Sequence, residues 1–276
     1  MDNPVQHLDA EAGGAQSVDR ALSLLSMIAR TGGSRVSIST LVEQSRLSRP
    51  TVRRLLLALM RSGLVEQDDV TRSYALGPES YVIGLMASRR FNLLDVAMDS
   101  LLTLSAESGD TSFLSVRRGT HSVCLHREDG SYPIRTHALQ AGQRHPLGVG
   151  AGGMAILADL PDTEAEDVIS DNATGLARDY PNYSPDLLRQ HIRDTRERGW
   201  ALNPGLYLAN SWAVGVAVHA PDGQVLGALS IAALDTRMQP DRQSDLAALL
   251  KREARIIEKR LSRKTLSTER RWPHNR

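Results

Sequence analysis

The chain has 276 residues, which is enough for two domains with a sizeable core. Its apolar runs are too short to span a membrane, and its first sixteen residues are polar and acidic, so we expect neither a membrane segment nor a signal peptide. The single cysteine, Cys124, excludes an internal disulfide and a cysteine-rich zinc site, and it fits a reducing cytoplasm.

The net charge of +1 hides an uneven distribution along the chain. Residues 17–76 carry nine arginines against five acidic residues, and residues 263–276 carry a net charge of +4. Residues 77–262 have a net charge of −4. A basic N-terminal module followed by a mildly acidic body is typical of a protein whose N-terminal part contacts phosphate groups.

The chain begins with residues 1–16, a Gly-, Asp- and Ala-rich stretch without periodicity that we expect to be disordered. A helix then begins near Ser17, whose hydroxyl can cap the first turn. Its apolar residues, among them Val18, Leu22 and Ile28, recur with the period of one helical face. We therefore expect that face to be buried.

Two short helices joined by a tight corner come next. Ser37 can cap the first of them, which carries Ile38, Leu41 and Val42 on one face. Only residues 46–47 separate it from the following helix, as a helix-turn-helix motif requires.

The second helix of the motif is the most informative stretch of the sequence. Ser48 is a candidate N-cap, and Pro50 suits the first turn, where the helix needs no backbone N–H. Four apolar residues at i, i+3, i+4 and i+7 share one face, which leaves the arginines on the exposed side. The apolar residues are Val52, Leu55, Leu56 and Leu59, and the arginines are Arg49, Arg53, Arg54 and Arg61.

Two short strands, 64–67 and 73–76, are predicted around a polar turn and complete a winged helix-turn-helix. Such a unit lays its second helix in the major groove of double-stranded DNA, where arginine can form two hydrogen bonds with guanine. The alternative is a sensor or scaffold protein whose motif mediates protein–protein contacts and whose arginines are a solvated face. We expect DNA contacts from Ser48, Arg49, Pro50, Thr51, Arg53, Arg54 and Arg72.

A connecting helix over residues 79–90 has Tyr81, Leu85 and Met86 on one side. One winged module covers too few base pairs for useful specificity, so we expect a homodimer or tetramer on a palindromic operator, joined through this helix. A second long helix follows over residues 93–108.

From Asp110 onward the hydrophobic period changes to that of strands, which predicts an α+β domain with a mostly antiparallel sheet. A glycine-rich corner, 148–153, is expected to open a helix over residues 154–160. The tail 263–276 is basic and expected to be loose. The remaining predictions are strands at 110–117, 121–127, 132–137, 200–203, 212–219 and 224–233 and helices at 162–169, 184–198 and 241–260.

The histidines and the cysteine are candidate metal ligands or catalytic groups. Four histidines at 121, 126, 137 and 145 suggest a metal, but the odd spacing of His121 and His126 sends them to opposite faces of a regular strand. Cys124 and His126 would share a face as a possible nucleophile pair, although plain neighbours are the commoner case. The glycine-rich corner lacks the Gly-Lys-Ser/Thr ending of a phosphate loop. We expect no metal, no cofactor and no enzymatic activity.

The order of these elements resembles the IclR family of bacterial transcription regulators, from about Gln16 to Leu261. The resemblance implies a winged helix-turn-helix over 17–77, a linker helix over 78–92 and a GAF-like effector-binding domain over 93–262. It also implies a cytoplasmic dimer or tetramer that regulates genes, often for catabolic pathways. The resemblance depends on Ser17–Leu22, Leu47–Leu56, Tyr74–Gly77, Arg198–Leu202 and Gly227–Ile231.

The resemblance also implies an effector pocket, which this sequence matches in part. Backbone N–H groups of Ala151 and Gly152 correspond to the family's carboxylate donors, and one of its two serines remains as Ser230. Relatives that bind small acids tend to have Asp, Cys and a second Ser where this chain has Asn203, Ala213 and Ala232.

These departures predict an effector other than a small diacid or keto acid. The pocket could be larger and more apolar, lined by Phe113, Leu206, Tyr207 and Trp212, although these residues could equally be core or interface. We therefore expect a DNA-binding regulator of a catabolic operon whose effector is a small organic acid, with an aromatic acid as one candidate.

Overall fold

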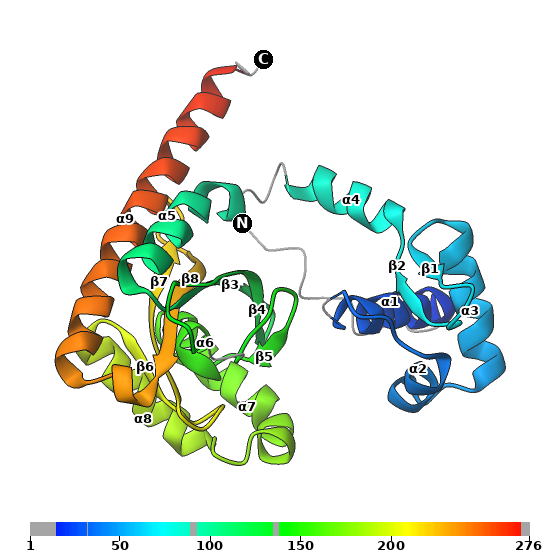
Figure 1. The fold of residues 1–276 in the computed structure, drawn as a ribbon, viewed down its shortest axis with the longest axis horizontal. Helices are drawn as coiled ribbons and strands as arrows, with labels where there is room; N and C mark the ends of the chain where they lie inside the picture. Colours follow the sequence, from blue (N-terminus) through cyan, green and yellow to red (C-terminus); the bar gives the residue numbers. More distant parts are fainter. Residues whose placement is uncertain (1–14, 32, 89–92, 135–137, 272–276) are drawn as a thin grey trace. The chain divides into compact units, whose positions relative to one another are not determined.

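The computed structural model describes residues 15–31, 33–88, 93–134 and 138–271. Contacts divide the chain into two units, residues 1–91 and residues 92–276, each with a hydrophobic core of its own (Figure 1). None of the described helices is both long and apolar enough to cross a membrane. The expected disordered stretch, 1–16, lies almost wholly outside the described residues.

The first unit combines helices with a small antiparallel sheet in its described part. Val65 lies opposite Leu76 in this sheet, and Val36 forms a bridge with Tyr74 that ties the sheet to the helices. The elements are α1 (Gln16–Ala29), α2 (Ile38–Ser45), α3 (Arg49–Arg61), β1 (Val65–Gln67), β2 (Tyr74–Leu76) and α4 (Pro78–Ser88).

The prediction of a helix-turn-helix is confirmed in its local details. The Ser37 hydroxyl accepts the backbone N–H of Thr40 at 3.1 Å and so caps α2. The Ser48 hydroxyl accepts the N–H of Thr51 at 3.4 Å and caps α3. The apolar stripe of α3 is buried against α1, α2 and the sheet, as its spacing indicated. The stripe comprises Val52, Leu55, Leu56 and Leu59.

The prediction for α1 was partly wrong. The helix begins at Gln16, so Ser17 lies inside it and no side chain caps its start. Val18 and Leu22 are 58% and 51% exposed, whereas Leu24 and Ile28 are fully buried. The sequence contains two overlapping apolar stripes of the same period, and packing against α3, which local periodicity does not encode, selects the one that is buried.

The second unit is built on a six-stranded antiparallel sheet in the order β5-β4-β3-β8-β7-β6. Helices α5 and α9 cover one face, and α6 covers the other with α7 and α8 outside it (Figure 1). The strands are β3 (Thr111–Arg118), β4 (His121–Glu128), β5 (Arg144–Pro146), β6 (Ala201–Pro204), β7 (Ser211–His219) and β8 (Val225–Leu234). The helices are α5 (Leu93–Ser108), α6 (Gly150–Ala158), α7 (Asp162–Asp179), α8 (Pro185–Arg198), η1 (Asp235–Arg237) and α9 (Pro240–Arg271).

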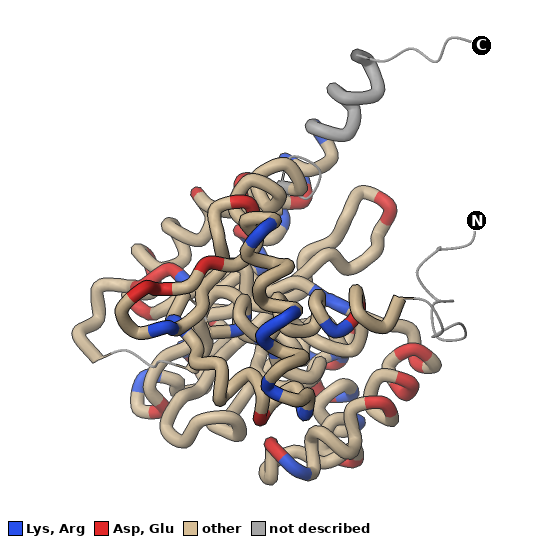
Figure 2. Tube along the Cα trace, turned by 90° about the vertical axis from the view of Figure 1, so that its right-hand side faces the viewer, with Lys and Arg blue, Asp and Glu red and all other residues tan. Residues whose placement is uncertain are grey.

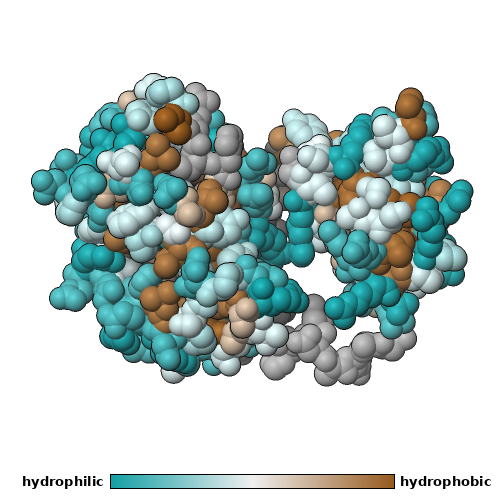
Figure 3. Space-filling model, turned by 60° about the horizontal axis from the view of Figure 1, so that its bottom comes forward, coloured by the Kyte–Doolittle hydropathy of each residue, from teal (hydrophilic) through white to brown (hydrophobic). Residues whose placement is uncertain are grey.

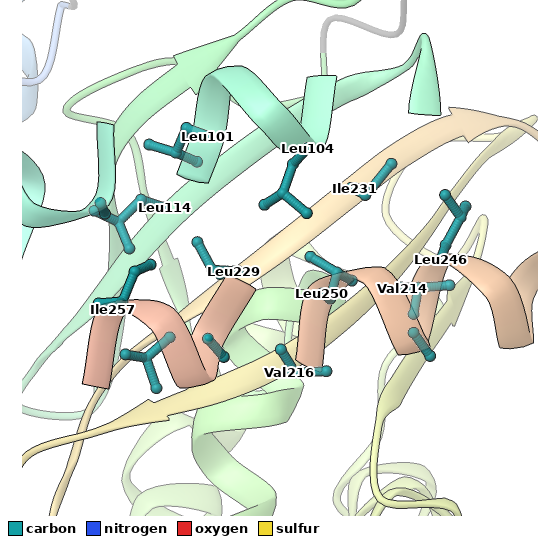
Figure 4. Close-up of a cluster of buried hydrophobic side chains, with 14 of the residues drawn as sticks. Leu101, Leu104, Leu114, Val214, Val216, Leu229, Ile231, Leu246, Leu250 and Ile257 are labelled. Carbon is teal, nitrogen blue, oxygen red and sulfur yellow. The ribbon is translucent and has the colours of Figure 1, made fainter. Parts of the chain in front are cut away.

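The main core of this unit lies between the sheet and the α5–α9 pair. Alternate residues of β3, β7 and β8 point toward these helices and meet leucines and isoleucines from both of them (Figure 4). The sheet face toward α5 and α9 is therefore closely packed with apolar side chains, whereas α6 packs against the opposite face. The labelled core residues are Leu101, Leu104, Leu114, Val214, Val216, Leu229, Ile231, Leu246, Leu250 and Ile257.

Four predicted elements differ from the structure. Residues 132–134 form no strand, and 135–137 lie outside the described residues; the edge strand is Arg144–Pro146 instead. The N–H of Tyr132 bonds the carbonyl of Gly109 at 2.9 Å, and its ring packs under the guanidinium of Arg237 at 3.9 Å. These contacts fold the segment back onto the end of α5 rather than along β4.

The other three differences concern helix ends. Helix α6 begins at Gly150, inside the glycine-rich corner, and not after it. Helix α9 continues to Arg271, so most of the tail expected to be loose from 263 is helical. Helix α7 is also longer than predicted, ending at Asp179 rather than at residue 169.

Candidate functional site

The start of α3 presents an exposed polar and basic surface. Ser48 and Thr51 also share a side-chain hydrogen bond of 2.8 Å, so both residues hold the first helical turn. Arg49, Arg53 and Arg54 are exposed and form no salt bridge with any described residue. Their charges remain free for an anionic partner; basic and acidic residues can be followed along the chain in Figure 2.

The other predicted residues of this surface are Pro50 and Arg72. Pro50 lies in the first turn of α3, as expected. Arg72 lies in the turn between β1 and β2, is exposed, and has a left-handed backbone with φ of 57°. The structure thus places six of the seven predicted residues on one helix start and the seventh at the wing.

The second candidate site lies on the sheet face that α6 covers. Gly215 of β7 allows the backbone of α6 to approach closely, because a Cβ at this position would lie 2.6 Å from the Ala151 carbonyl oxygen. Gly152 is packed in the same way, with the hydroxyl oxygens of Ser230 and Ser115 at 3.4 and 3.5 Å from the position of an added Cβ. The first turn of α6 therefore rests directly on β3, β7 and β8.

This helix start offers unpaired hydrogen-bond donors. No side chain caps α6, and the N–H of Gly150 donates to the Tyr183 hydroxyl at 3.2 Å. The N–H groups of Ala151 and Gly152 belong to the first turn and have no partner within the helix. The Ser115 and Ser230 hydroxyls are almost buried and bond no described residue. Together with the positive end of the helix dipole, these groups suit a carboxylate.

A pocket opens at this point. Seven of the eight residues predicted to bind the ligand line it, and they come from four strands and α6. Several of them form a small apolar cluster with Cys124. The seven are Phe113, Ala151, Gly152, Asn203, Ala213, Ser230 and Ala232.

Trp212 does not line the pocket, so this part of the prediction is wrong. Residues alternate across a strand, and the neighbours Ser211 and Ala213 face the pocket. Trp212 consequently faces the other side and packs against the core beneath α9. Leu206 packs against the helices around α6 instead, while Tyr207 lines the pocket.

The sequence analysis missed several polar residues of the pocket. Ser115 lies two residues after Phe113 on the same strand, so strand alternation could have found it. Ser122 and His145 face the pocket from β4 and β5, where they lie opposite each other. His145 could not be placed because the short strand β5 carries little periodic signal.

The side-chain oxygen of Asn203 is already used in hydrogen bonds within the protein. Its Oδ1 accepts the Leu206 N–H at 3.2 Å and the Tyr183 hydroxyl at 3.4 Å. Its amide nitrogen forms no hydrogen bond with a described residue, so Asn203 can offer only donors to a ligand.

His145 is held by an aromatic group at the side of the pocket. Its Nδ1 lies 2.8 Å from the Tyr180 hydroxyl, and its ring centroid lies 4.6 Å from that of Tyr207. Burial, together with the nearby charge of His121, lowers the pKa of His145 to about 4. The imidazole is therefore neutral at neutral pH.

A β-bulge overturns the predicted placement of the strand's histidines. The register pairs Ser115 with Cys124 but Leu114 with His126, so Leu125 is an extra residue in β4. His121 and His126 consequently share the face toward α5, and Cys124 lies on the opposite face. No group of three or more potential metal ligands occurs among the described residues.

Cys124 itself is buried in the apolar cluster of the pocket face. Burial raises the pKa of its thiol to about 12, and its Sγ donates a weak hydrogen bond to the His126 carbonyl at 3.3 Å. The separation of faces and the protonated thiol together exclude a Cys124–His126 nucleophile pair.

Comparison with known families shows to which family the chain belongs. Residues 17–69 match the IclR helix-turn-helix domain, and residues 86–259 match the C-terminal domain of the bacterial transcriptional regulator IclR. The chain belongs to the IclR family. The protein is thus a DNA-binding transcriptional regulator and not an enzyme.

Individual relatives agree with this assignment over nearly the whole chain. The transcriptional repressor AllR of Klebsiella pneumoniae is 28% identical over 92% of this chain and 93% of its own length. The repressor IclR of Escherichia coli is 25% identical over 89% of each.

Solved structures of IclR regulators have the same fold. One from Silicibacter sp. TM1040 has a TM-score of 0.76 at 26% identity, covering 89% of this chain and 96% of that one. An IclR homologue from Microbacterium hydrocarbonoxydans, solved in complex with 4-hydroxybenzoate, has a TM-score of 0.74 at 19% identity, covering 89% of this chain and 99% of that one.

The contact at Gly215 leads to a stability prediction. We expect Gly215→Ala to lower the free energy of unfolding of the second unit by about 2 kcal/mol, because the new methyl group overlaps the α6 backbone. Urea unfolding followed by tryptophan fluorescence measures this, since all three tryptophans lie within residues 92–276.

Gly175→Ala is the matched control for this experiment. Gly175 lies in α7 with open space around an added Cβ, so the change should stabilise the protein by up to about 1 kcal/mol through helix propensity. If Gly215→Ala unfolds at the wild-type urea concentration, the close approach of α6 is not as described.

Proposed function

We propose that the protein regulates a catabolic operon in response to a monocarboxylate with an apolar or aromatic body. As an IclR-family regulator it binds DNA and a small-molecule effector. The proposal of a monocarboxylate effector is based on the convergence of unpaired hydrogen-bond donors at the start of α6. Two backbone N–H groups and two serine hydroxyls surround one end of a pocket that is otherwise mostly apolar.

The charge of the pocket favours one carboxylate over two. None of the described residues that line it is a lysine, arginine, aspartate or glutamate. The donors of α6, Ser115 and Ser230 converge on one carboxylate, whereas a second would meet only neutral groups, such as the Asn203 amide and the side chains of Phe113 and Ala213. Burial of a second negative charge without a cationic partner costs several kcal/mol, so a diacid is disfavoured.

The apolar body is supported by the same side chains. Phe113, Leu139 and Tyr207 provide flat or branched surfaces, and the two alanines leave room beside them. The homologue from Microbacterium hydrocarbonoxydans binds 4-hydroxybenzoate, which supports an aromatic acid as a ligand that this fold accommodates.

A thermal-shift screen tests the effector class. Aromatic and other apolar monocarboxylates should raise the melting temperature as their concentration passes the dissociation constant, while small diacids and keto acids should not. Ser230→Ala should weaken the best acid by roughly tenfold or more, because it removes a hydrogen bond to a charged group.

Ser170→Ala is the control, since Ser170 is exposed on α7. Unaltered binding in Ser230→Ala would show that the carboxylate is held elsewhere. If only diacids raise the melting temperature, the proposal of an apolar pocket is wrong.

The DNA-contacting role of the α3 start is a second proposal. Arg53→Ala and Arg54→Ala should each cost about 1–3 kcal/mol of operator affinity if the side chain contacts a base. If the side chain contacts a phosphate instead, its removal should reduce the slope of log affinity against log salt concentration by about one. Gel-shift titration at several salt concentrations measures both quantities.

Arg178→Ala is the control for these variants, because Arg178 lies in α7 and pairs with Asp179. Wild-type affinity in both α3 variants would remove these arginines from the interface. Binding that hardly responds to salt would favour the alternative of a protein-contacting module.

Association through α4 is a third proposal. Five of its residues are exposed large hydrophobic side chains, and Tyr81 is 73% exposed. On the face shown in Figure 3, apolar side chains lie among polar ones in both units. An eleven-residue helix with apolar groups around its circumference needs a covering surface, and a second copy of α4 provides one. The five are Tyr81, Val82, Ile83, Leu85 and Met86.

Light scattering tests this association. Wild type should be a dimer or tetramer at micromolar concentration, and the double variant Tyr81→Ser with Met86→Ser should shift toward a smaller species because it removes apolar area. Val70→Ser is the control, since Val70 is 91% exposed but lies in the β1–β2 turn. A monomeric wild type, with and without DNA, would refute the proposal.

A further inference from the structure

One buried polar atom in the effector pocket lacks a partner. Five buried side-chain nitrogen or oxygen atoms in the described part of the chain form no hydrogen bond, and only His145 Nε2 belongs to a residue that lines this pocket. A buried polar atom without a partner is costly, so its presence in a pocket points to a ligand group that pairs with it.

The orientation of the His145 ring is fixed by its neighbours. Nδ1 is occupied by the Tyr180 hydroxyl at 2.8 Å, and the rings of Tyr180 and Tyr207 meet the imidazole edge-on, at centroid distances of 5.8 and 4.6 Å. Tyr207 comes from the connection between β6 and β7, whereas His145 comes from β5 at the other edge of the sheet. The imidazole is thus held from two sides, which leaves Nε2 as its free atom.

The place of His145 in the sheet sets its distance from the carboxylate donors. His145 lies opposite Ser122 on β4, Ser122 lies opposite Arg117 on β3, and Ser115 is two residues from Arg117 along β3. Two strand spacings of about 4.8 Å, combined with an offset of two residues of about 3.4 Å each, place the two positions roughly 12 Å apart. Hydrogen bonds of about 2.8 Å at the two ends leave roughly 6 Å, which is the span between opposite substituents of one six-membered ring.

The chemistry of the imidazole selects the partner group. The ring is neutral, so Nε2 either donates or accepts one hydrogen bond, depending on which nitrogen holds the proton. A hydroxyl can pair with Nε2 in both tautomers, whereas a keto oxygen or a carboxylate can pair in only one. A hydroxyl is therefore the group that fits this position best.

We propose that His145 is a specificity-determining residue of the effector pocket, and that its Nε2 forms a hydrogen bond with a ring hydroxyl opposite the carboxylate of an aromatic acid. This inference rests on the proposed monocarboxylate site at the start of α6. It adds that the protein distinguishes hydroxylated acids from unsubstituted ones.

The test compares two probes, benzoate and 4-hydroxybenzoate, by isothermal titration calorimetry on the full chain. Wild type should bind 4-hydroxybenzoate about tenfold more tightly than benzoate, the effect of one well-placed hydrogen bond. His145→Phe should bind the two acids with nearly equal affinity, because its ring fills the same space without a polar atom. His145→Gln should keep part of the preference, because its amide can still bond a hydroxyl.

The outcomes separate this inference from the proposed function. If wild type binds the two acids equally, or if His145→Phe keeps the full preference, the proposed role of His145 is wrong. Neither result contradicts the proposed carboxylate site. Failure of both acids to bind overturns the role of His145 and the aromatic acid together. Because the wild-type preference alone can refute the inference, the test does not depend on the folding of any variant.

Discussion

The close contact between the start of α6 and the middle of the sheet is the constraint on which the effector pocket depends. Gly215 removes the side chain that would hold the helix away, and the first-turn backbone then lies beside two serine hydroxyls. Donors that would otherwise be spread over a helix end and two strands are brought to one point. The contact needs no charged residue: it brings neutral donors and the positive end of a helix dipole together, and this is the point that we propose as the carboxylate site.

The two faces of the sheet divide stability and recognition between them. On the face toward α5 and α9, large branched side chains from every central strand fill the space. On the other face, the same strands carry alanine, glycine and serine where they meet α6. A strand that alternates large and small residues can therefore stabilise the fold on one side and leave a cavity on the other. Substitutions that change ligand preference need not reach the main core.

The sequence predicted best where the controlling interactions are local. Helix α3 has its cap, its proline and its apolar stripe within thirteen residues, and all three were identified correctly. The buried face of α1, the strand β5 and the orientation of Trp212 depend on partners distant in sequence. The bulge at Leu125 shifted a histidine to the opposite face, which no residue spacing could indicate. Seven of the residues expected at the effector site do meet at one pocket, but His145 and Ser115 were recognised only from the fold.

The buried state of Cys124 has a consequence for the kind of signal this regulator can receive. Oxidants and electrophiles attack the thiolate, and the only thiol in the chain stays protonated inside an apolar cluster. Oxidative stress therefore finds no reactive sulfur to convert into a sulfenic acid or a bridge between subunits. A thiol-based redox switch therefore does not fit this chain.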